Sequence, residues 1–330
     1  MAHGPRVPGR RKLRTYLRVL LPSVIAFLIV FLTVVGYISY HIIFPEVSTE
    51  GNPVDYSLLQ YKEVQAPYSG GSAWFLAGNP GAPAVFLCHD YGFNRMSTVN
   101  LANSLHDQGY NLFILSLRGH TGGSSVPTSF GLLEGSDLAA TIDSALVLSA
   151  VDRTRVGVWG VGLGAHAALR AALIDPRIRV LVLDSPYPSV YDFIDYHVTK
   201  RIGFQSKIFG GSVGLVSAAL NMTTPLAFYE HVTPASLQGR AVLYVVGRDS
   251  PSFVDWTKQL HDETPGEKQL VLLPRSRRSV LQTPEWNAYD ERVVAFVTNH
   301  LPVTVEREPS SQSPTRDRQK RVAAKQAKNR

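Results

Sequence analysis

The strongest constraint on the fold of this chain is a set of short apolar runs that alternate with longer helical patterns. The runs lack the strict polar alternation of a half-exposed strand, which is typical of strands buried on both faces. Strands of this kind that alternate with helices form a parallel sheet covered on both sides, so we predict an α/β fold. The expected strands are 84–88, 111–116, 155–160, 179–184, 241–246 and 269–273, and the expected helices are 97–108, 134–150, 163–175, 252–262 and 284–300.

Two segments depart from this rhythm. Residues 61–67 and 72–76 flank Gly70-Gly71 and predict a hairpin at the edge of the sheet. Residues 186–236 are rich in Tyr, Phe, Ser and Gly and interrupt the alternation between two strands. We expect this segment to be an insertion that forms a lid.

The N-terminal part of the chain contains a long apolar run. Val19 to Phe44 comprises 26 residues without Asp, Glu, Lys or Arg, and a helix needs about 20 residues to cross the hydrocarbon core. A cleavable signal peptide is one alternative, but its apolar core is usually about 7–15 residues long and an A-x-A-like site follows it. A buried core helix is another, but it is rarely apolar on all sides. We therefore predict a single-pass membrane anchor over 19–44.

The positive charge of the chain lies at its ends. The net charge is +7, yet residues 1–18 hold six basic groups and residues 315–330 hold seven, which leaves the body between them mildly acidic. This distribution argues against a core that binds nucleic acid. We expect a basic cytoplasmic segment (1–18), a linker (45–56), one folded domain (57–302) and a disordered basic tail (303–330) that could contact an anionic surface.

The most informative motif is a glycine-rich turn between a strand and a helix. The strand at 155–159 runs into Gly160-Val161-Gly162-Leu163-Gly164 and then into a helical pattern. This is the context of the nucleophile elbow G-x-S-x-G, in which the serine attacks the substrate. Here Gly162 occupies the position of the serine. Glycine also avoids the strain of about 1–3 kcal/mol that the elbow conformation imposes on other residues.

With this motif and three others in the same order, the chain resembles the α/β-hydrolase superfamily, in particular the bacterial dienelactone-hydrolase-like and prolyl-oligopeptidase-like serine hydrolases. The others are the histidine-led loop 89–95 (HDYGFNR), Arg118-Gly119-His120, and a strand that ends in Gly247-Arg248-Asp249. The resemblance covers roughly 61–300 and implies the α/β-hydrolase fold behind the N-terminal helix.

The resemblance also implies site residues. The backbone N–H groups of Tyr91 and Leu163 would form the oxyanion hole, and Asp249 would be the acid of the triad, with Asp184 as a substitute. Asp90 departs from the glycine that is usual at the second position of the oxyanion loop. It places a carboxylate beside a site that stabilises negative charge.

The base of the triad is missing from its expected loop. In the superfamily a histidine follows the last strand, but here the loop 274–279 reads PRSRRS, and none of the ten histidines lies in it. Arg278 stands at the base position, or Arg277 does if the alignment with the family is shifted by one residue. A guanidinium with a pKa above about 12 cannot take a proton from a serine.

Two functions remain after this comparison. The first is a membrane-anchored, catalytically degenerate hydrolase that binds an unknown ligand or protein partner, or acts as a scaffold. The second is an active esterase or peptidase with an unorthodox site, for which Ser124, Ser125 and Ser185 are the candidate nucleophiles. We expect no cofactor and no metal, because the sequence has no zinc-binding histidine motif and the glycine-rich turn lacks the Lys-Ser/Thr ending of a phosphate loop.

The charge around the apolar run predicts the topology of the chain. The basic cluster of residues 10–18 precedes the run, so the N-terminus should be cytoplasmic and the main domain should lie outside the cytoplasm, in the periplasm of a Gram-negative source. A reporter that is active only outside the cytoplasm should therefore be active when it is fused after Arg330. Activity of the fusion only in the cytoplasm would contradict this topology.

Overall fold

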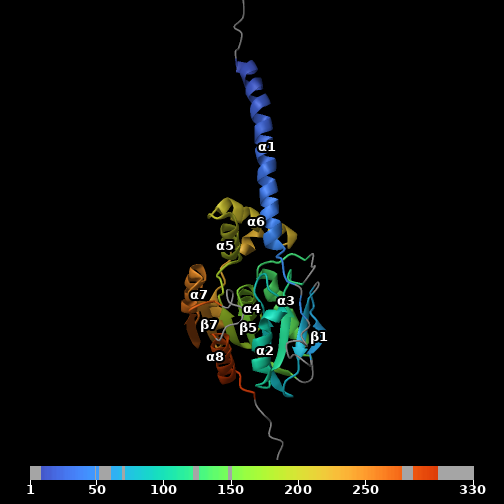
Figure 1. The fold of residues 1–330 in the computed structure, drawn as a ribbon, viewed down its shortest axis with the longest axis vertical. Helices are drawn as coiled ribbons and strands as arrows, with labels where there is room; N and C mark the ends of the chain where they lie inside the picture. The colour runs from blue at the N-terminus through green and yellow to red at the C-terminus, as the bar shows by residue number, and fades with distance from the viewer. Residues whose placement is uncertain are drawn as a thin grey trace, which may run out of the picture.

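The structure is a computed structural model that describes residues 9–48, 50–51, 61–68, 71–121, 126–147, 151–276 and 285–303. An eight-stranded sheet in the order β1-β2-β4-β3-β5-β6-β7-β8 forms the centre of the domain (Figure 1). The strands are β1 (Tyr61–Gln65), β2 (Ser72–Leu76), β3 (Ala82–Cys88), β4 (Asn111–Ser116), β5 (Val151–Val161), β6 (Ile178–Asp184), β7 (Ala241–Gly247) and β8 (Lys268–Leu273).

The predicted parallel sheet and edge hairpin are confirmed. Strands β3 to β8 pair in parallel. Strand β2 is antiparallel to both β1 and β4, so the hairpin extends the sheet at one edge.

Helices cover both faces of the sheet. The helices α3 (Leu132–Ala145), α4 (Leu163–Ile174) and α7 (Pro251–Glu263) contribute to one hydrophobic core. The helices α2 (Val99–His106) and α8 (Glu285–His300) contribute to the core on the other face.

Helix α2 is shorter than the sequence predicts. A 3-10 turn, η2 (Arg95–Thr98), precedes it where the prediction began the helix, and the side chain of Asn94 caps this turn by accepting a hydrogen bond from the N–H of Met96. An asparagine side chain that bonds its own nearby backbone competes with α-helical hydrogen bonding.

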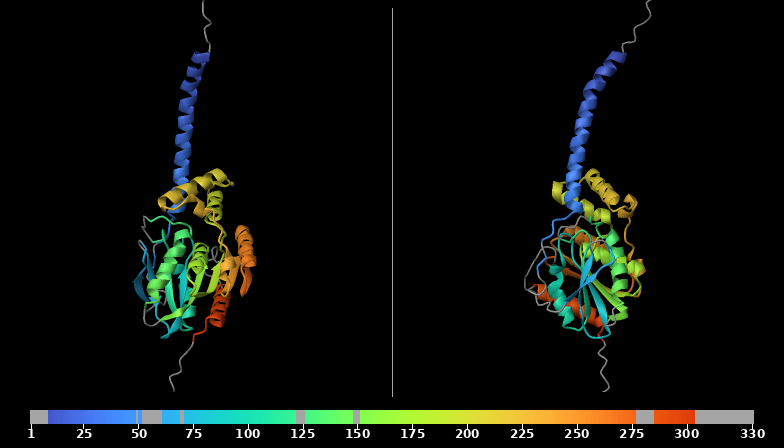
Figure 2. Two further views of the ribbon diagram at one scale, coloured as in Figure 1. Left: turned by 180° about the vertical axis from the view of Figure 1, so that it is seen from behind. Right: turned by 90° about the vertical axis from the view of Figure 1, so that its right-hand side faces the viewer.

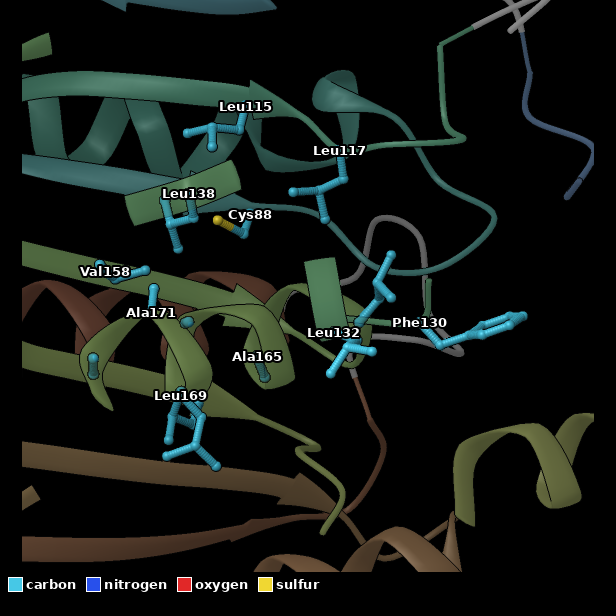
Figure 3. Packing of buried hydrophobic residues seen from close by; sticks show 14 of the residues in the cluster. Cys88, Leu115, Leu117, Phe130, Leu132, Leu138, Val158, Ala165, Leu169 and Ala171 are labelled. Carbon is cyan, nitrogen blue, oxygen red and sulfur yellow. The ribbon is translucent and has the colours of Figure 1, made fainter. Parts of the chain in front are cut away.

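The core on the α3 and α4 side is close-packed (Figure 3). The ring of Phe113 stacks between Phe75 and Phe86, with both centroid distances at 4.8 Å. Cys88 is the only cysteine of the chain and lies within this core. Burial raises the pKa of its thiol to about 12, so the thiol stays protonated at neutral pH.

The N-terminal apolar run forms part of the long helix α1 (Gly9–Ile43), which projects from the domain (Figure 1). Its stretch Leu20–Ile43 has a mean hydropathy of 2.5 and is long and apolar enough to cross a membrane. A signal sequence near the N-terminus has the same properties, so the structure establishes the apolar helix and leaves the anchor and its topology as predictions.

The predicted insertion contains α5 (Val190–Ile202), α6 (Lys207–Leu220) and two 3-10 turns, η3 (Pro225–Phe228) and η4 (Pro234–Leu237). Helices α5 and α6 lie beside the C-terminal part of α1 in every view (Figure 2). The rings of Phe31 in α1 and Phe209 in α6 are 5.7 Å apart.

Hydrogen bonds attach the end of α1 to the domain. The carbonyl oxygen of Ile42 accepts a hydrogen bond from the Tyr91 hydroxyl at 2.8 Å, and that of Ile43 accepts one from the N–H of Thr128 at 3.1 Å. Further along, the guanidinium of Arg95 pairs with Glu50 at 2.6 Å. The described part of the predicted linker is therefore bound to the domain. The basic tail beyond residue 303 lies outside the described residues, and the other segment boundaries stay predictions.

Candidate functional site

The glycine-rich motif forms a tight turn between β5 and α4. The N–H of Gly162 donates to the carbonyl oxygen of Asp184 at 2.8 Å, and the carbonyl oxygen of Gly162 accepts from the N–H of His166 at 3.0 Å. Gly162 has φ of 50° and ψ of −107°. This is a conformation that residues with a side chain adopt only with strain.

The turn packs closely against the end of β3. A Cβ atom added to Gly164 would lie 2.2 Å from the carbonyl oxygen of Cys88, and one added to Gly160 would lie 2.3 Å from the backbone of Gly164. Both glycines are therefore required by the close approach of two backbones. This packing brings the turn next to the loop that follows β3.

The carboxylate of Asp90 fills the space beside Gly162. Its Oδ1 accepts hydrogen bonds from the N–H groups of Tyr91 at 2.7 Å and Leu163 at 3.0 Å. These are the two donors that the resemblance assigns to the oxyanion hole. A Cβ atom on Gly162 would lie 1.9 Å from the same oxygen. The side chain of Asp90 thus occupies the position that the resemblance assigns to the oxyanion, and the space that a side chain at position 162 would need.

The surroundings favour a negative charge at this oxygen. Leu163 is the first residue of α4, so its N–H has no partner within the helix and carries part of the positive end of the helix dipole. A carboxylate that accepts from backbone N–H groups makes charge-assisted bonds, which are stronger than neutral ones. The side chain of Asp90 therefore supplies the hydrogen-bond acceptor at the start of α4.

The two candidate acids lie at the ends of β6 and β7. Asp249 follows β7, and its Oδ1 accepts a hydrogen bond from the N–H of Ser276 at 2.7 Å. This bond connects Asp249 to the loop after β8. Asp184 is buried at the end of β6, and its Oδ1 accepts from the hydroxyl of Ser185 at 2.8 Å. Of the candidate nucleophiles, only Ser185 is described.

The base position cannot be placed in the same way. Arg277 and Arg278 lie outside the described residues, as do Ser124 and Ser125. The roles that the sequence analysis assigns to Gly162, Asp249 and Arg278 stay predictions.

His89 is held by backbone groups on both sides of its ring. Its Nδ1 lies 2.8 Å from the carbonyl oxygen of Asp90, and its Nε2 accepts from the N–H of Leu117 at 3.1 Å. Burial lowers the pKa of His89 to about 3. Both ring nitrogens are engaged and the ring is neutral, so His89 orients the Asp90 loop and has no free lone pair with which to act as a base.

Two further histidines are also buried and neutral. The Nδ1 of His120 lies 2.7 Å from the carbonyl oxygen of Arg118, and burial lowers its pKa to about 4. In α4, the ring of His166 stacks on Tyr187 with centroids 4.4 Å apart, and burial lowers its pKa to about 3.

A pocket of about 480 Å³ lies where α1, the Asp90 loop and α5 meet. Among its lining residues are the cations Lys200 and Arg201, the histidines His41 and His197, and one acid, Glu46. This pocket could not be predicted from the sequence, because its residues come from three distant segments. The adjacent Lys200 and Arg201 in the predicted lid were the available signal. Within the described ranges, no group of three or more His, Cys, Asp or Glu side chains is placed to hold a metal ion.

Comparisons with known proteins bear on the family and the fold of the chain. A sequence model of the alpha/beta hydrolase family matches residues 59–327. An Escherichia coli relative, the uncharacterized 31.7 kDa protein in the traX-finO intergenic region, is 27% identical over 111 residues, which are 32% of this chain and 37% of that protein. The chain therefore spans about a third of the length of this curated relative.

Solved structures show the same fold. The esterase Pf2001 from Pyrococcus furiosus superposes with a TM-score of 0.59 and 21% identity, and the match covers 78% of this chain and 98% of that one. Dienelactone hydrolase from Anabaena variabilis gives a TM-score of 0.53 at 15% identity, covering 73% and 97% of the two chains. At these identities the likeness establishes the fold alone.

The contact between Asp90 and position 162 predicts strong coupling between the two residues. Gly162→Ala should lower the free energy of unfolding through both backbone strain and the clash with Asp90. In an Asp90→Gly background only the strain should remain, so the double-mutant cycle should show a coupling on the order of 1–3 kcal/mol. Chemical denaturation of the full chain in detergent micelles measures it.

Gly81→Ala is the matched control for this cycle. Gly81 also has a positive φ, 73°, but an added Cβ would meet no atom within 4 Å. Its substitution should cost the same free energy with or without Asp90. Equal costs of Gly162→Ala in the two backgrounds would show that Asp90 does not occupy the space beside Gly162.

The buried histidines predict a loss of stability on acidification. Their pKa values lie near 3 to 4 in the folded chain and near 6.5 in an unfolded one, so below about pH 6.5 the unfolded state binds more protons. The free energy of unfolding should therefore fall from about pH 6.5 to about pH 4, by up to roughly 1.4 kcal/mol per pH unit for each histidine. Denaturation curves across this window test the slope.

Two variants on α4 separate titration from packing. His166→Phe should remove one histidine's share of the slope. Leu169→Ala, a buried position in the same helix, should lower stability and leave the slope unchanged. An unchanged slope in His166→Phe would contradict the assignment of His166 as a buried neutral group.

Proposed function

Because this chain belongs to the alpha/beta hydrolase family, we propose that it is a catalytically degenerate hydrolase that binds a ligand or partner at a membrane. The observation that carries the proposal is the position of Asp90. Its carboxylate oxygen lies between the N–H groups of Tyr91 and Leu163 and in the space that a side chain at position 162 would need.

A carboxylate in this position opposes ester hydrolysis in two ways. An oxyanion hole works because its donors lie about 2.7–3.1 Å from the oxygen that becomes negative in the transition state. Here the donors already bind a negative oxygen at 2.7 and 3.0 Å. A second developing charge at the same place would also be repelled by the carboxylate.

The nucleophile and the aspartate exclude each other. With glycine at position 162, no side chain competes with the Asp90 carboxylate for this space. The two departures from the family pattern are thus compatible with each other, whereas Asp90 is incompatible with a side chain at position 162. This mutual fit supports a site that has been rebuilt around a fixed internal anion.

The pocket beside the site indicates what the chain could bind. Lys200 and Arg201 bring two positive charges to it, and Glu46 supplies one negative charge. This balance favours an anionic ligand. The pocket borders Tyr91, so a bound ligand would lie next to the Asp90 loop.

Reaction of the full-length protein with a fluorophosphonate probe tests the loss of activity. We expect no labelling and no turnover of short-chain esters, because position 162 has no hydroxyl and its oxyanion donors are occupied. Labelling that disappears in Ser185→Ala would instead support an active hydrolase with an unorthodox site, the alternative function.

Restoring the triad should require at least three changes. Gly162→Ser alone should stay inactive, because Asp90 blocks the hydroxyl and no base activates it. Adding Asp90→Gly opens the oxyanion hole, and adding Arg278→His supplies a group with a pKa near 6.5 that Asp249 could orient. The triple variant should gain ester hydrolysis far beyond the sum of its parts, as is usual for residues that act as a unit.

The same triple variant with Gly162→Ala in place of Gly162→Ser is the matched control, since it lacks only the hydroxyl. Arg277→His is tested in parallel with Arg278→His to allow for the register. Enzymatic turnover by Gly162→Ser alone would show that a base is already present and would refute the degenerate triad.

A further inference from the structure

We propose that the lid, defined here as residues 190–229 with α5, α6 and η3, is embedded in the membrane leaflet on the domain side of α1. The inference rests on the proposed role of α1 as a membrane anchor. It adds a second membrane contact, made by the domain itself, through a surface whose partner is the acyl-chain region of the bilayer.

The exposed apolar side chains of the domain are concentrated on the lid. Beyond α1, the large hydrophobic residues exposed in the described part of the chain are Val147, Leu173 and Ile174 outside the lid, and Phe204, Ile208, Leu215, Leu220, Met222, Leu226 and Tyr229 within it. Met222 is 94% exposed and Leu226 77%. Such a concentration marks an interaction surface, since isolated exposed apolar residues are normal but clusters are not.

The contact with α1 places this surface at the depth of the bilayer. Arg18 is the last charged residue before the apolar run. A hydrocarbon core of about 30 Å corresponds to about 20 helical residues and so extends from Val19 to about Ile38. Phe31 then lies about 10 Å inside the far boundary at a rise of about 1.5 Å per residue. Because its ring contacts Phe209, α6 reaches the same depth.

The lid also replaces lipid along one side of α1. Val35, Ile38 and Ile42 are buried, whereas Leu20 to Val30 include many exposed apolar residues. The N-terminal half of the apolar stretch of α1 is therefore exposed on all sides, and its C-terminal half packs on the lid. A lid that covers a membrane-spanning helix at this depth must itself face lipid on its outer side.

Arg201 of the lid lies at the expected boundary. The guanidinium of Arg201 lies 5.7 Å from the centre of the Tyr37 ring, and Tyr37 is next to the calculated boundary at Ile38. Neither Arg201 nor the adjacent Lys200 forms an ion pair with another described residue. Basic side chains at this level suit the phosphates of lipid headgroups, while Phe209 lies deeper, beside Phe31.

Site-directed spin labelling of the full-length protein in phosphatidylcholine–phosphatidylglycerol vesicles tests the inference. Single cysteines are placed on α6 of the lid, at Ile208→Cys, which is next to Phe209, and at Leu215→Cys. Ile174→Cys on α4 is the matched control, because Ile174 and Leu215 are both 58% exposed. Cys88 needs no replacement, since it is buried and its raised pKa keeps it protonated.

The readout is the collision rate of each label with oxygen, which concentrates in lipid, relative to a water-soluble nickel chelate. We expect this ratio to be severalfold higher at Ile208→Cys and Leu215→Cys than at Ile174→Cys. Equal ratios at the three positions would overturn the proposal. So would low accessibility of the lid labels to both reagents, which would indicate that a second copy or another protein covers the lid.

A label at Phe27→Cys, in the exposed half of α1, separates this inference from the anchor. A lipid-facing Phe27→Cys label with water-facing lid labels would refute the embedded lid alone. A water-facing Phe27→Cys label would refute both the anchor and the lid. Neither result bears on the loss of catalysis, which the fluorophosphonate probe tests independently.

Discussion

One carboxylate oxygen, Oδ1 of Asp90, connects the two segments on which the candidate site depends. It joins the loop after β3 to Leu163, the first residue of α4, directly after the turn that follows β5. The same oxygen defines the space next to Gly162, and the carbonyl oxygen of Asp90 orients the buried ring of His89. The site is therefore organised around an internal negative charge, in a frame whose backbone follows the hydrolase pattern.

Much of the frame could be predicted from the sequence because its signals are local. Continuous apolar runs predicted the buried strands, and the spacing of Gly160, Gly162 and Gly164 predicted the tight turn. The position of Asp90 required more. The sequence showed a departure from glycine, but Asp90 and Leu163 are 73 positions apart, and only the packing of β3 against β5 brings them together.

The contacts of the lid could not be predicted for the same reason. The sequence of residues 186–236 does not indicate that Phe209 contacts Phe31. It also does not indicate that Lys200 and Arg201 line a pocket together with the end of α1. Helix ends were also misjudged where side chains decide them, as at Asn94, whose cap converts the first predicted turn of α2 into a 3-10 turn. The residue at the base position is predicted from the sequence alone, because Arg277 and Arg278 lie outside the described residues.

The attachment of α1 to the domain has a consequence for any truncation. The last carbonyl groups of a helix have no partner within it, and for Ile42 and Ile43 the domain supplies the Tyr91 hydroxyl and the Thr128 N–H. Deleting α1 would leave these two donors without acceptors and would expose the apolar lid surface that covers Val35 and Ile38. A fragment that starts after residue 44 therefore differs from the same domain in the whole chain, because the face beside its pocket, which α1 normally covers, is exposed to solvent.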